Sequence, residues 1–68
     1  MELIINHTRK IFEIPPRNLE ALLIMEMSQK KNGIAVAVNN RIVPRSSWPE
    51  TILKDKDSIL IITATQGG

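Results

Sequence analysis

Ser58-Ile59-Leu60-Ile61-Ile62-Thr63 is an almost continuous apolar run, and five residues after it the sequence ends in Gly67-Gly68. Isoleucine is β-branched and favours strands, so the run predicts a last strand from about Ser58 to Ala64. Successive side chains of a strand point to opposite faces of its sheet. We therefore assign Ile59 and Ile61 to the core and Leu60 and Ile62 to the opposite face.

Gly67 and Gly68 have no Cβ, so the tail that they end is thin and can adopt backbone conformations closed to other residues. The terminal carboxylate is ionised at neutral pH. A narrow stalk that ends in a carboxylate suits insertion into the active site of another protein, and Gln66 is predicted to enter with the two glycines. A frayed terminus is the alternative interpretation.

Two short runs near the N-terminus predict a β-hairpin. Residues 2–6 form the first strand, with Leu3 and Ile5 on the core face and Ile4 on the other face. Asn6-His7-Thr8 is the turn, and residues 9–14 form the second strand. Pro15-Pro16 ends the hairpin, because proline supplies no donor to a ladder.

A helix is predicted next, with Asn18 as its N-cap and Glu20 in its first turn. Asn32-Gly33 supplies a left-handed stop after Lys30 and Lys31. The apolar stripe of this helix, at helical spacing, consists of Leu19, Leu22, Leu23 and Met27.

The remaining chain predicts two more strands and an irregular connection. Residues 34–39 form the third strand, and residues 42–43 begin a fourth that Pro44 ends. Residues 45–51 are polar and irregular, with one 3₁₀ turn, and Ile52-Leu53 enters the core. The charges of residues 54–57 cancel, which is typical of an exposed turn.

This order of elements predicts an α+β fold with a mixed sheet of about five strands and one main helix across one face. The first and last strands are expected side by side and parallel at the centre. This is the β-grasp arrangement typified by ubiquitin. Residues 1–68 then form a single domain with a flexible tail at 65–68.

One helix covers one face of such a sheet, which leaves Ile4, Leu60 and Ile62 on the open face. Large aliphatic side chains gathered on an exposed surface often mark a protein interface. We predict a partner-docking patch formed by these three residues. The alternatives are that loops fold over this face or that it is ordinary surface.

Composition excludes several classes of protein. The 68 residues include no cysteine, which rules out disulfides, thiolate metal sites and thiol catalysis by this chain. The net charge of +2 is too small to argue for nucleic acid. No apolar run approaches the roughly 20 residues that cross a bilayer, and the N-terminus lacks a signal-peptide pattern. We expect a cytoplasmic protein without membrane or nucleic-acid partners.

One internal segment and the terminal Gly67-Gly68 resemble the ThiS family, the sulfur carrier proteins of thiamin biosynthesis. The segment reads Val36-Ala37-Val38-Asn39-Asn40-Arg41-Ile42-Val43-Pro44-Arg45-Ser46-Ser47-Trp48. The resemblance covers essentially the whole chain. Two departures stand out: Pro15-Pro16-Arg17-Asn18 replaces the usual turn before the helix, and Thr63-Ala64-Thr65-Gln66 is more polar than in usual members.

The resemblance implies that a ThiF-type adenylating enzyme uses Mg-ATP to activate the carboxylate of Gly68. A persulfide sulfur then displaces AMP and leaves a thiocarboxylate, from which a ThiG-type thiazole synthase accepts the sulfur. The chain itself has no glycine-rich phosphate loop and no metal-ligand cluster, so we expect a protein substrate that binds no cofactor or metal.

Three alternatives stay open at this stage. Gly67-Gly68 alone also fits a carrier for molybdopterin or another sulfur-containing product. A non-covalent β-grasp binding module would make the glycines incidental, and a modifier conjugated to lysines would use them differently. Single residues add little: His7 fits a solvated turn, and Trp48 fits a packing role.

Overall fold

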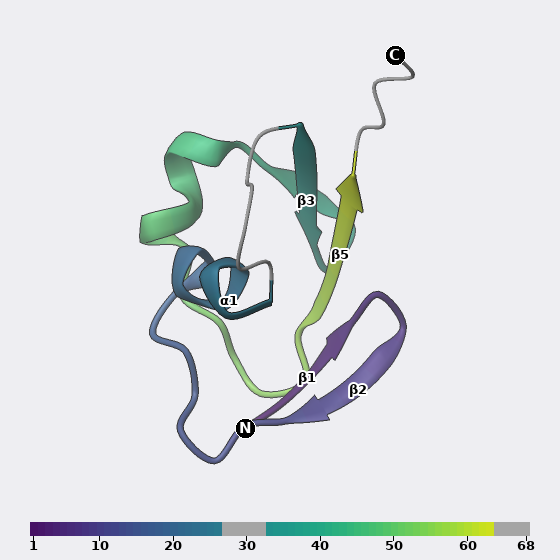
Figure 1. Cartoon of the computed structure of the whole chain (residues 1–68), viewed down its shortest axis with the longest axis vertical. Helices are drawn as coiled ribbons and strands as arrows, with labels where there is room; N and C mark the ends of the chain where they lie inside the picture. Colours follow the sequence, from purple (N-terminus) through teal and green to yellow (C-terminus); the bar gives the residue numbers. More distant parts are fainter. Residues whose placement is uncertain (27–32, 64–68) are drawn as a thin grey trace.

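The computed structural model describes residues 1–26 and 33–63. Met27, Lys30, Lys31, Asn32, Ala64, Gln66, Gly67 and Gly68, all named in the predictions above, lie outside the described residues. Figure 1 shows the elements in chain order, which are β1 (Glu2–Ile5), β2 (Thr8–Ile11), α1 (Leu19–Glu26), β3 (Ile34–Val38), β4 (Arg41–Val43), the 3₁₀ segment η1 (Arg45–Glu50) and β5 (Ser58–Thr63).

The five strands form one mixed sheet in the order β2-β1-β5-β3-β4. β1 and β5 are parallel, with Ile4 opposite Ser58 and Ile5 opposite Ile59. β5 is antiparallel to β3, and both hairpins are antiparallel. The predicted central pair of first and last strands is therefore confirmed, and the fold is a β-grasp.

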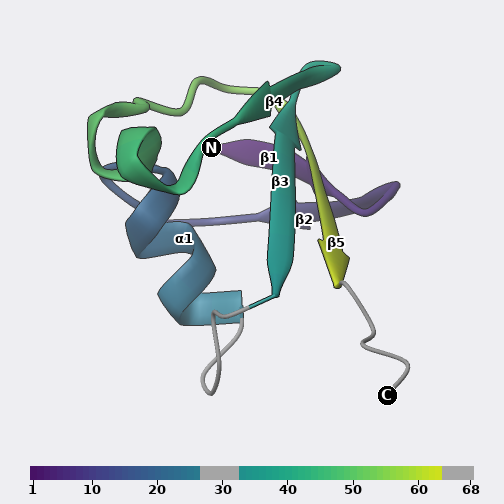
Figure 2. The same ribbon diagram turned by 90° about the horizontal axis from the view of Figure 1, so that it is seen from above.

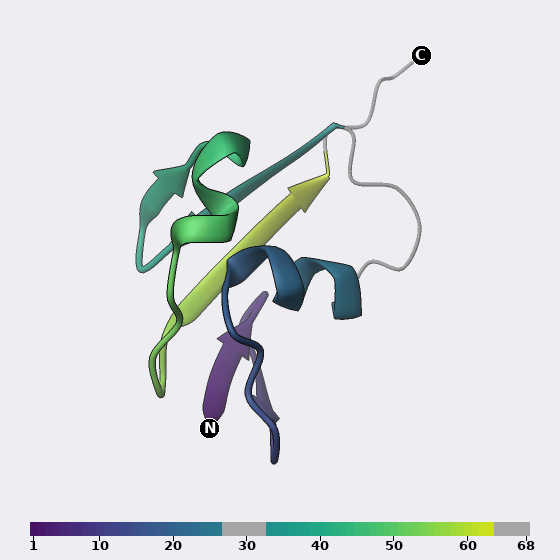
Figure 3. The same ribbon diagram turned by 90° about the vertical axis from the view of Figure 1, so that its left-hand side faces the viewer.

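α1 and η1 lie on the same side of the sheet, and the views in Figures 2 and 3 agree on this layering. The core lies between these two elements and the sheet. The apolar side chains of this core cluster, each less than a tenth exposed, are Leu3, Ile5, Leu19, Leu22, Leu23, Val36, Trp48, Leu53 and Ile59. Ile61 was also assigned to this face and packs against the cluster while half-buried.

Both hairpins turn through two residues in the left-handed region. Asn6 and His7 have φ of 51° and 68°, and Asn39 and Asn40 have φ of 52° and 71°. Two such residues in succession match the type I′ turn, whose twist suits the flanking strands and which favours asparagine. The first turn is therefore Asn6-His7 alone, and Thr8 already belongs to β2.

The prediction of a second strand over residues 9–14 is wrong at both ends, because β2 spans Thr8–Ile11. β1 explains where β2 ends. Ile11 pairs with Glu2, and the next residue, Phe12, exchanges hydrogen bonds with Met1. Residues 13 and 14 lie past that last pairing and leave the sheet.

The predicted N-cap of the helix is confirmed. The Asn18 side-chain oxygen accepts a hydrogen bond from the backbone N–H of Ala21 at 2.8 Å, and Glu20 lies in the first turn. The other end of the Asn18 side chain donates to the carbonyl of Pro49 at 3.1 Å, which links α1 to η1. Gly33, the residue before β3, has φ 75°, a conformation in which glycine carries no Cβ penalty.

The segment between β4 and β5 is more regular than predicted. η1 covers six residues, and Trp48 within it is 2% exposed and donates its indole N–H to the carbonyl of Val43 at 2.9 Å. The packing role of Trp48 is confirmed. The prediction for Ile52-Leu53 is wrong for one residue: Leu53 is buried, but Ile52 is 65% exposed. Consecutive residues of an extended segment point to opposite sides, so one of the pair faces away from the core.

Candidate functional site

β5 is the element that connects the sheet to the predicted tail. It lies between β1 and β3 and ends at Thr63, while Gln66, Gly67 and Gly68 lie outside the described residues. In Figure 1, β5 is the strand drawn in yellow-green. The candidate site is therefore built from the surface that accompanies β5 to this point.

The pairing register places Ile4, Leu60 and Ile62 on the face of the sheet away from α1. On β5, Leu60 and Ile62 alternate with the core-facing Ile59 and Ile61. The side chain of Leu60 is 36% exposed, and that of Ile62 is 47% exposed. Ile4 alternates with the buried Leu3 and Ile5, and it pairs with Ser58, two residues before Leu60. Whether this face binds a partner stays a prediction.

Two residues that the sequence analysis did not assign extend this surface. Leu60 pairs with Ala37 of β3, and Ala37 pairs in turn with Ile42 of β4. Ile42 is 67% exposed, whereas the small Ala37 between the two larger side chains is 7% exposed. Because paired residues point to one face, these side chains form an apolar row across three strands. We call Leu60, Ala37 and Ile42 the apolar row, and Ile4 and Ile62 lie beside it on the same open face.

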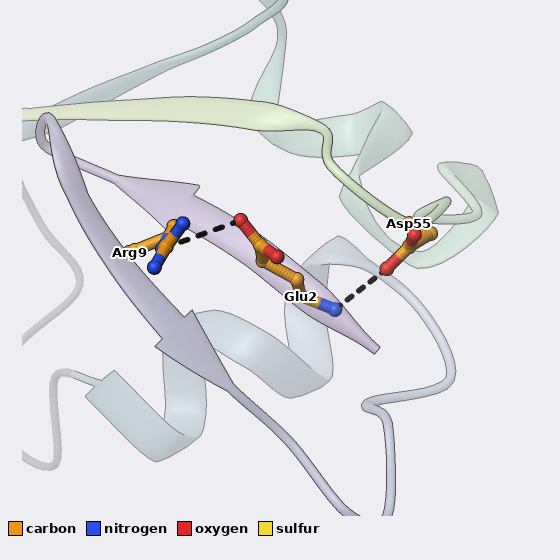
Figure 4. Close-up of polar contacts among 3 residues, drawn as sticks. All are labelled: Glu2, Arg9 and Asp55. Carbon is orange, nitrogen blue, oxygen red and sulfur yellow. Dashed lines mark hydrogen bonds and ion pairs between the residues drawn. The ribbon is translucent and has the colours of Figure 1, made fainter.

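Charged groups border this surface on the side of β1 and β2. The Nε of Arg9 lies 3.5 Å from a carboxylate oxygen of Glu2, its diagonal neighbour on the adjacent strand (Figure 4). The backbone N–H of Glu2 donates to a carboxylate oxygen of Asp55 at 2.7 Å, so the turn before β5 is joined to β1. The open face therefore passes from an apolar centre to a charged edge.

Side chains from both hairpin turns bind the backbone of β5. The Asn6 side-chain oxygen accepts a hydrogen bond from the N–H of Ile61 at 2.7 Å, and its backbone N–H donates to Ile59 at 2.8 Å. The Asn39 side-chain oxygen accepts from the N–H of Ser58 at 3.0 Å. β5 is thus held at its start and at its middle by residues far away in sequence.

The other polar residues considered from the sequence lie outside this surface. His7 is exposed in the first turn, as predicted. Arg45 lies over the ring of Trp48, with 5.8 Å between its guanidinium carbon and the ring centroid. Asp57 accepts hydrogen bonds from the Asn39 side chain and the Lys54 backbone, so both of its carboxylate oxygens support the turn before β5.

A separate open cleft of about 420 Å³ lies between the β3–β4 hairpin and the segment that precedes β5. Its lining residues are Val38, Asn39, Arg41, Val43, Thr51, Ile52, Lys54 and Asp57. Within residues 1–26 and 33–63, no group of three or more histidine and acidic side chains is placed to hold a metal ion. In the same described ranges, no helix has the length and apolar character that a membrane span requires.

Comparison with known proteins identifies the family. The sulfur carrier protein ThiS of Escherichia coli (strain K12) is 39% identical over 46 residues, which are 68% of this chain and 70% of that protein. The crystal structure of a thiamine biosynthesis protein (ThiS) from Geobacter metallireducens aligns over 100% of both chains with a TM-score of 0.86 at 22% identity, a likeness of fold. The family model of ThiS matches residues 3–68, and this chain belongs to the ThiS family.

Proposed function

We propose that this chain is a sulfur carrier of thiamin biosynthesis and that the carboxylate of Gly68 carries the sulfur. Membership of the ThiS family supports the proposal, as does the Gly67-Gly68 ending. The observation that carries it is the position of β5, which bears Leu60 and Ile62 on the open face and leads toward Gly68.

The chemistry of a carboxylate explains why such a carrier needs a partner with ATP. A carboxylate is a poor electrophile until one of its oxygens becomes part of a good leaving group. We assign this step to a ThiF-type adenylating enzyme that binds Mg-ATP. The Gly68 carboxylate attacks the α-phosphorus, and pyrophosphate leaves.

Sulfur transfer follows from the acyl-adenylate. The terminal sulfur of a persulfide attacks the acyl carbon, and AMP leaves with the bonding electron pair. A thiol then reduces the resulting sulfur–sulfur bond and releases the thiocarboxylate, from which a ThiG-type thiazole synthase takes the sulfur. In this scheme the chain is a protein substrate, and ATP and magnesium belong to the partner.

Docking is assigned to the open face. Ile4, Leu60 and Ile62 form the docking patch, with Ala37 and Ile42 as its extension toward β4. Burial of exposed apolar side chains favours association, and the patch adjoins the strand that leads to Gly68. A cytoplasmic location, where these partners would be found, stays a prediction.

The test is the intact mass of the untagged protein after incubation with the adenylating enzyme, Mg-ATP and a sulfide source. We expect a gain equal to one oxygen-to-sulfur exchange, localised to the C-terminal peptide and absent from a Gly68-deleted chain. If an enzyme that charges another carrier leaves this chain unchanged, a non-covalent binding module becomes the better interpretation.

The pathway is decided by a second incubation. The charged chain is presented to thiazole synthase and, separately, to the large subunit of a molybdopterin synthase. Loss of the added sulfur with thiazole synthase alone is the expected result. Loss with the molybdopterin enzyme alone would keep the carrier chemistry and replace the pathway.

A further inference from the structure

Asn6 makes two contacts with β5, one through its backbone N–H and one through its side-chain oxygen. β1 pairs with β5 at Ile4–Ser58 and Ile5–Ile59, and β1 ends at Ile5. Past that end, the backbone N–H of Asn6 donates to the carbonyl of Ile59 at 2.8 Å, and its side-chain oxygen accepts from the N–H of Ile61 at 2.7 Å. The side chain of Asn6 thus continues the hydrogen bonding along the β1 side of β5 past the residue at which β1 ends.

The position has two requirements that asparagine meets together. Its φ of 51° lies in the left-handed region, where asparagine, aspartate and histidine are enriched among the residues that carry a side chain. The partner at Ile61 is a backbone N–H, which can only donate, so the oxygen of the Asn6 amide must face it. Glycine would satisfy the backbone requirement alone, and aspartate would satisfy both.

Ile61 lies between the two β5 residues of the docking patch. The hydrogen bond from its N–H to Asn6 restrains the peptide plane that joins Leu60 to Ile61, and the next residue is Ile62. Leu60 and Ile62 point to the open face, and their side chains are 36% and 47% exposed, respectively. A surface that is held in its bound geometry before docking loses less conformational entropy when it docks.

We propose that Asn6 is a positioning residue for the docking patch: its side chain fixes β5 at Ile61 and so presents Leu60 and Ile62 to the partner enzyme. This inference rests on the proposed function. It assigns a role in recognition to a turn residue that lies outside the apolar surface itself.

Four variants form the test. N6G removes the side-chain acceptor and keeps the turn, and N6D keeps an acceptor oxygen. N40G and N40D are the matched controls, because Asn40 also has a positive φ in a two-residue turn and its side chain makes no hydrogen bond within the described residues. Effects of glycine on the unfolded chain and of added charge are then shared by each pair.

The first measurement is amide hydrogen exchange at Ile61 relative to Ile59 within each variant. Loss of one hydrogen bond is expected to raise this ratio by about 5- to 10-fold in N6G and to leave N6D and both controls near wild type. An equal ratio in N6G and N40G would overturn the inference, because the bond would then not hold β5.

The second measurement is the response of the adenylating enzyme. We expect N6G to raise KM for the carrier by about 3- to 10-fold with kcat within about twofold, since only docking is weakened. N6D should restore KM. Faster exchange at Ile61 with an unchanged KM would refute the positioning role. A bond with a merely structural role would change the exchange rate at Ile61 and leave KM unchanged.

Failure of the proposed function has a different signature. Wild-type chain that gains no sulfur, with an enzyme that charges another carrier, would refute the carrier proposal. Direct titration of the same enzyme with wild-type and N6G chains then decides the present inference. Weaker binding of N6G than of N40G supports it, and equal binding or no binding of any chain overturns it.

Discussion

The side-chain oxygen of Asn39 accepts a hydrogen bond from the backbone N–H of Ser58 at 3.0 Å, across 19 residues of sequence. The side-chain nitrogen of the same residue donates to a carboxylate oxygen of Asp57, also at 3.0 Å. The other oxygen of Asp57 accepts from the backbone N–H of Lys54 at 2.8 Å. One asparagine therefore joins the β3–β4 turn to both the start of β5 and the turn before it.

Replacement of Asn39 should destabilise the protein more than replacement of its neighbour. N39A removes both side-chain hydrogen bonds, whereas N40A places alanine at a similar positive φ without that loss. Two hydrogen bonds correspond to about 1–3 kcal/mol of additional destabilisation in N39A relative to N40A. Urea unfolding midpoints compare the two variants, and equal midpoints would mean that these exposed bonds contribute nothing measurable.

The N-cap of α1 offers a second test, because Asn18 has separate roles at the two ends of its side chain. N18A loses the bond to Ala21 and the bond to Pro49, and the cap alone corresponds to about 1 kcal/mol. N18D keeps an acceptor for the Ala21 N–H and adds negative charge at the helix N-terminus, where it is favourable. Thermal unfolding should place N18D between wild type and N18A. A midpoint of N18D at or below that of N18A would contradict the capping role, because both variants lack the bond to Pro49 and only N18D keeps an acceptor for Ala21.

Trp48 should be the most sensitive position in the connection between β4 and β5. Truncation of a buried tryptophan to alanine costs about 3–5 kcal/mol. That loss is comparable with the whole stability of a domain of this size, since native proteins have about 0.05–0.15 kcal/mol per residue. W48A is therefore expected to be largely unfolded at room temperature by circular dichroism.

W48F separates the ring from the indole N–H. It keeps an aromatic side chain in the core and loses the hydrogen bond to the Val43 carbonyl, so we expect a folded protein destabilised by about 1–3 kcal/mol. Far-ultraviolet circular dichroism is the readout, because Trp48 is the single tryptophan and fluorescence is lost with it. S46A, at an exposed position of the same 3₁₀ segment, is the control that should stay at the wild-type midpoint.

Local patterns were sufficient to predict the elements that depend on local chemistry. The almost continuous run of apolar, mostly β-branched residues predicts β5, and the capping oxygen of Asn18 predicts the start of α1. The central pairing of the first and last strands was also predictable, because a short chain with one helix leaves few arrangements.

The features that sequence reasoning missed depend on partners far away in the chain. The end of β2 is set by Met1, with which Phe12 pairs, and not by the proline pair that follows. Ile42 joins the apolar row because Ala37 pairs with both Ile42 and Leu60. The alternation of residues within one strand does not predict which residues of neighbouring strands pair. The bond from Asn6 to Ile61 spans 55 residues, so the turn propensity of Asn6 was visible and its contact with β5 was not.

Substitutions on the open face should separate docking from stability. Leu60 and Ile62 are 36% and 47% exposed, so L60S and I62S remove apolar surface that solvent already reaches in the folded protein. Unfolding midpoints should change little, because surface substitutions away from packed features usually alter stability by about 0.5 kcal/mol or less. Affinity for the adenylating enzyme, measured by titration, should fall by about 10-fold or more if these side chains become buried at the interface.

Two further serine variants define the extent of the docking surface. I24S is the matched control, because Ile24 is 52% exposed on α1, on the opposite side of the sheet. I42S tests the extension across β3 to β4, and Ile42 is 67% exposed. We expect I42S to weaken binding and I24S to leave it unchanged. Equal affinities for I24S, L60S and I62S would remove the open face from the docking proposal. If L60S and I62S lower the affinity and I42S does not, docking is confined to β5 and the neighbouring strand β1.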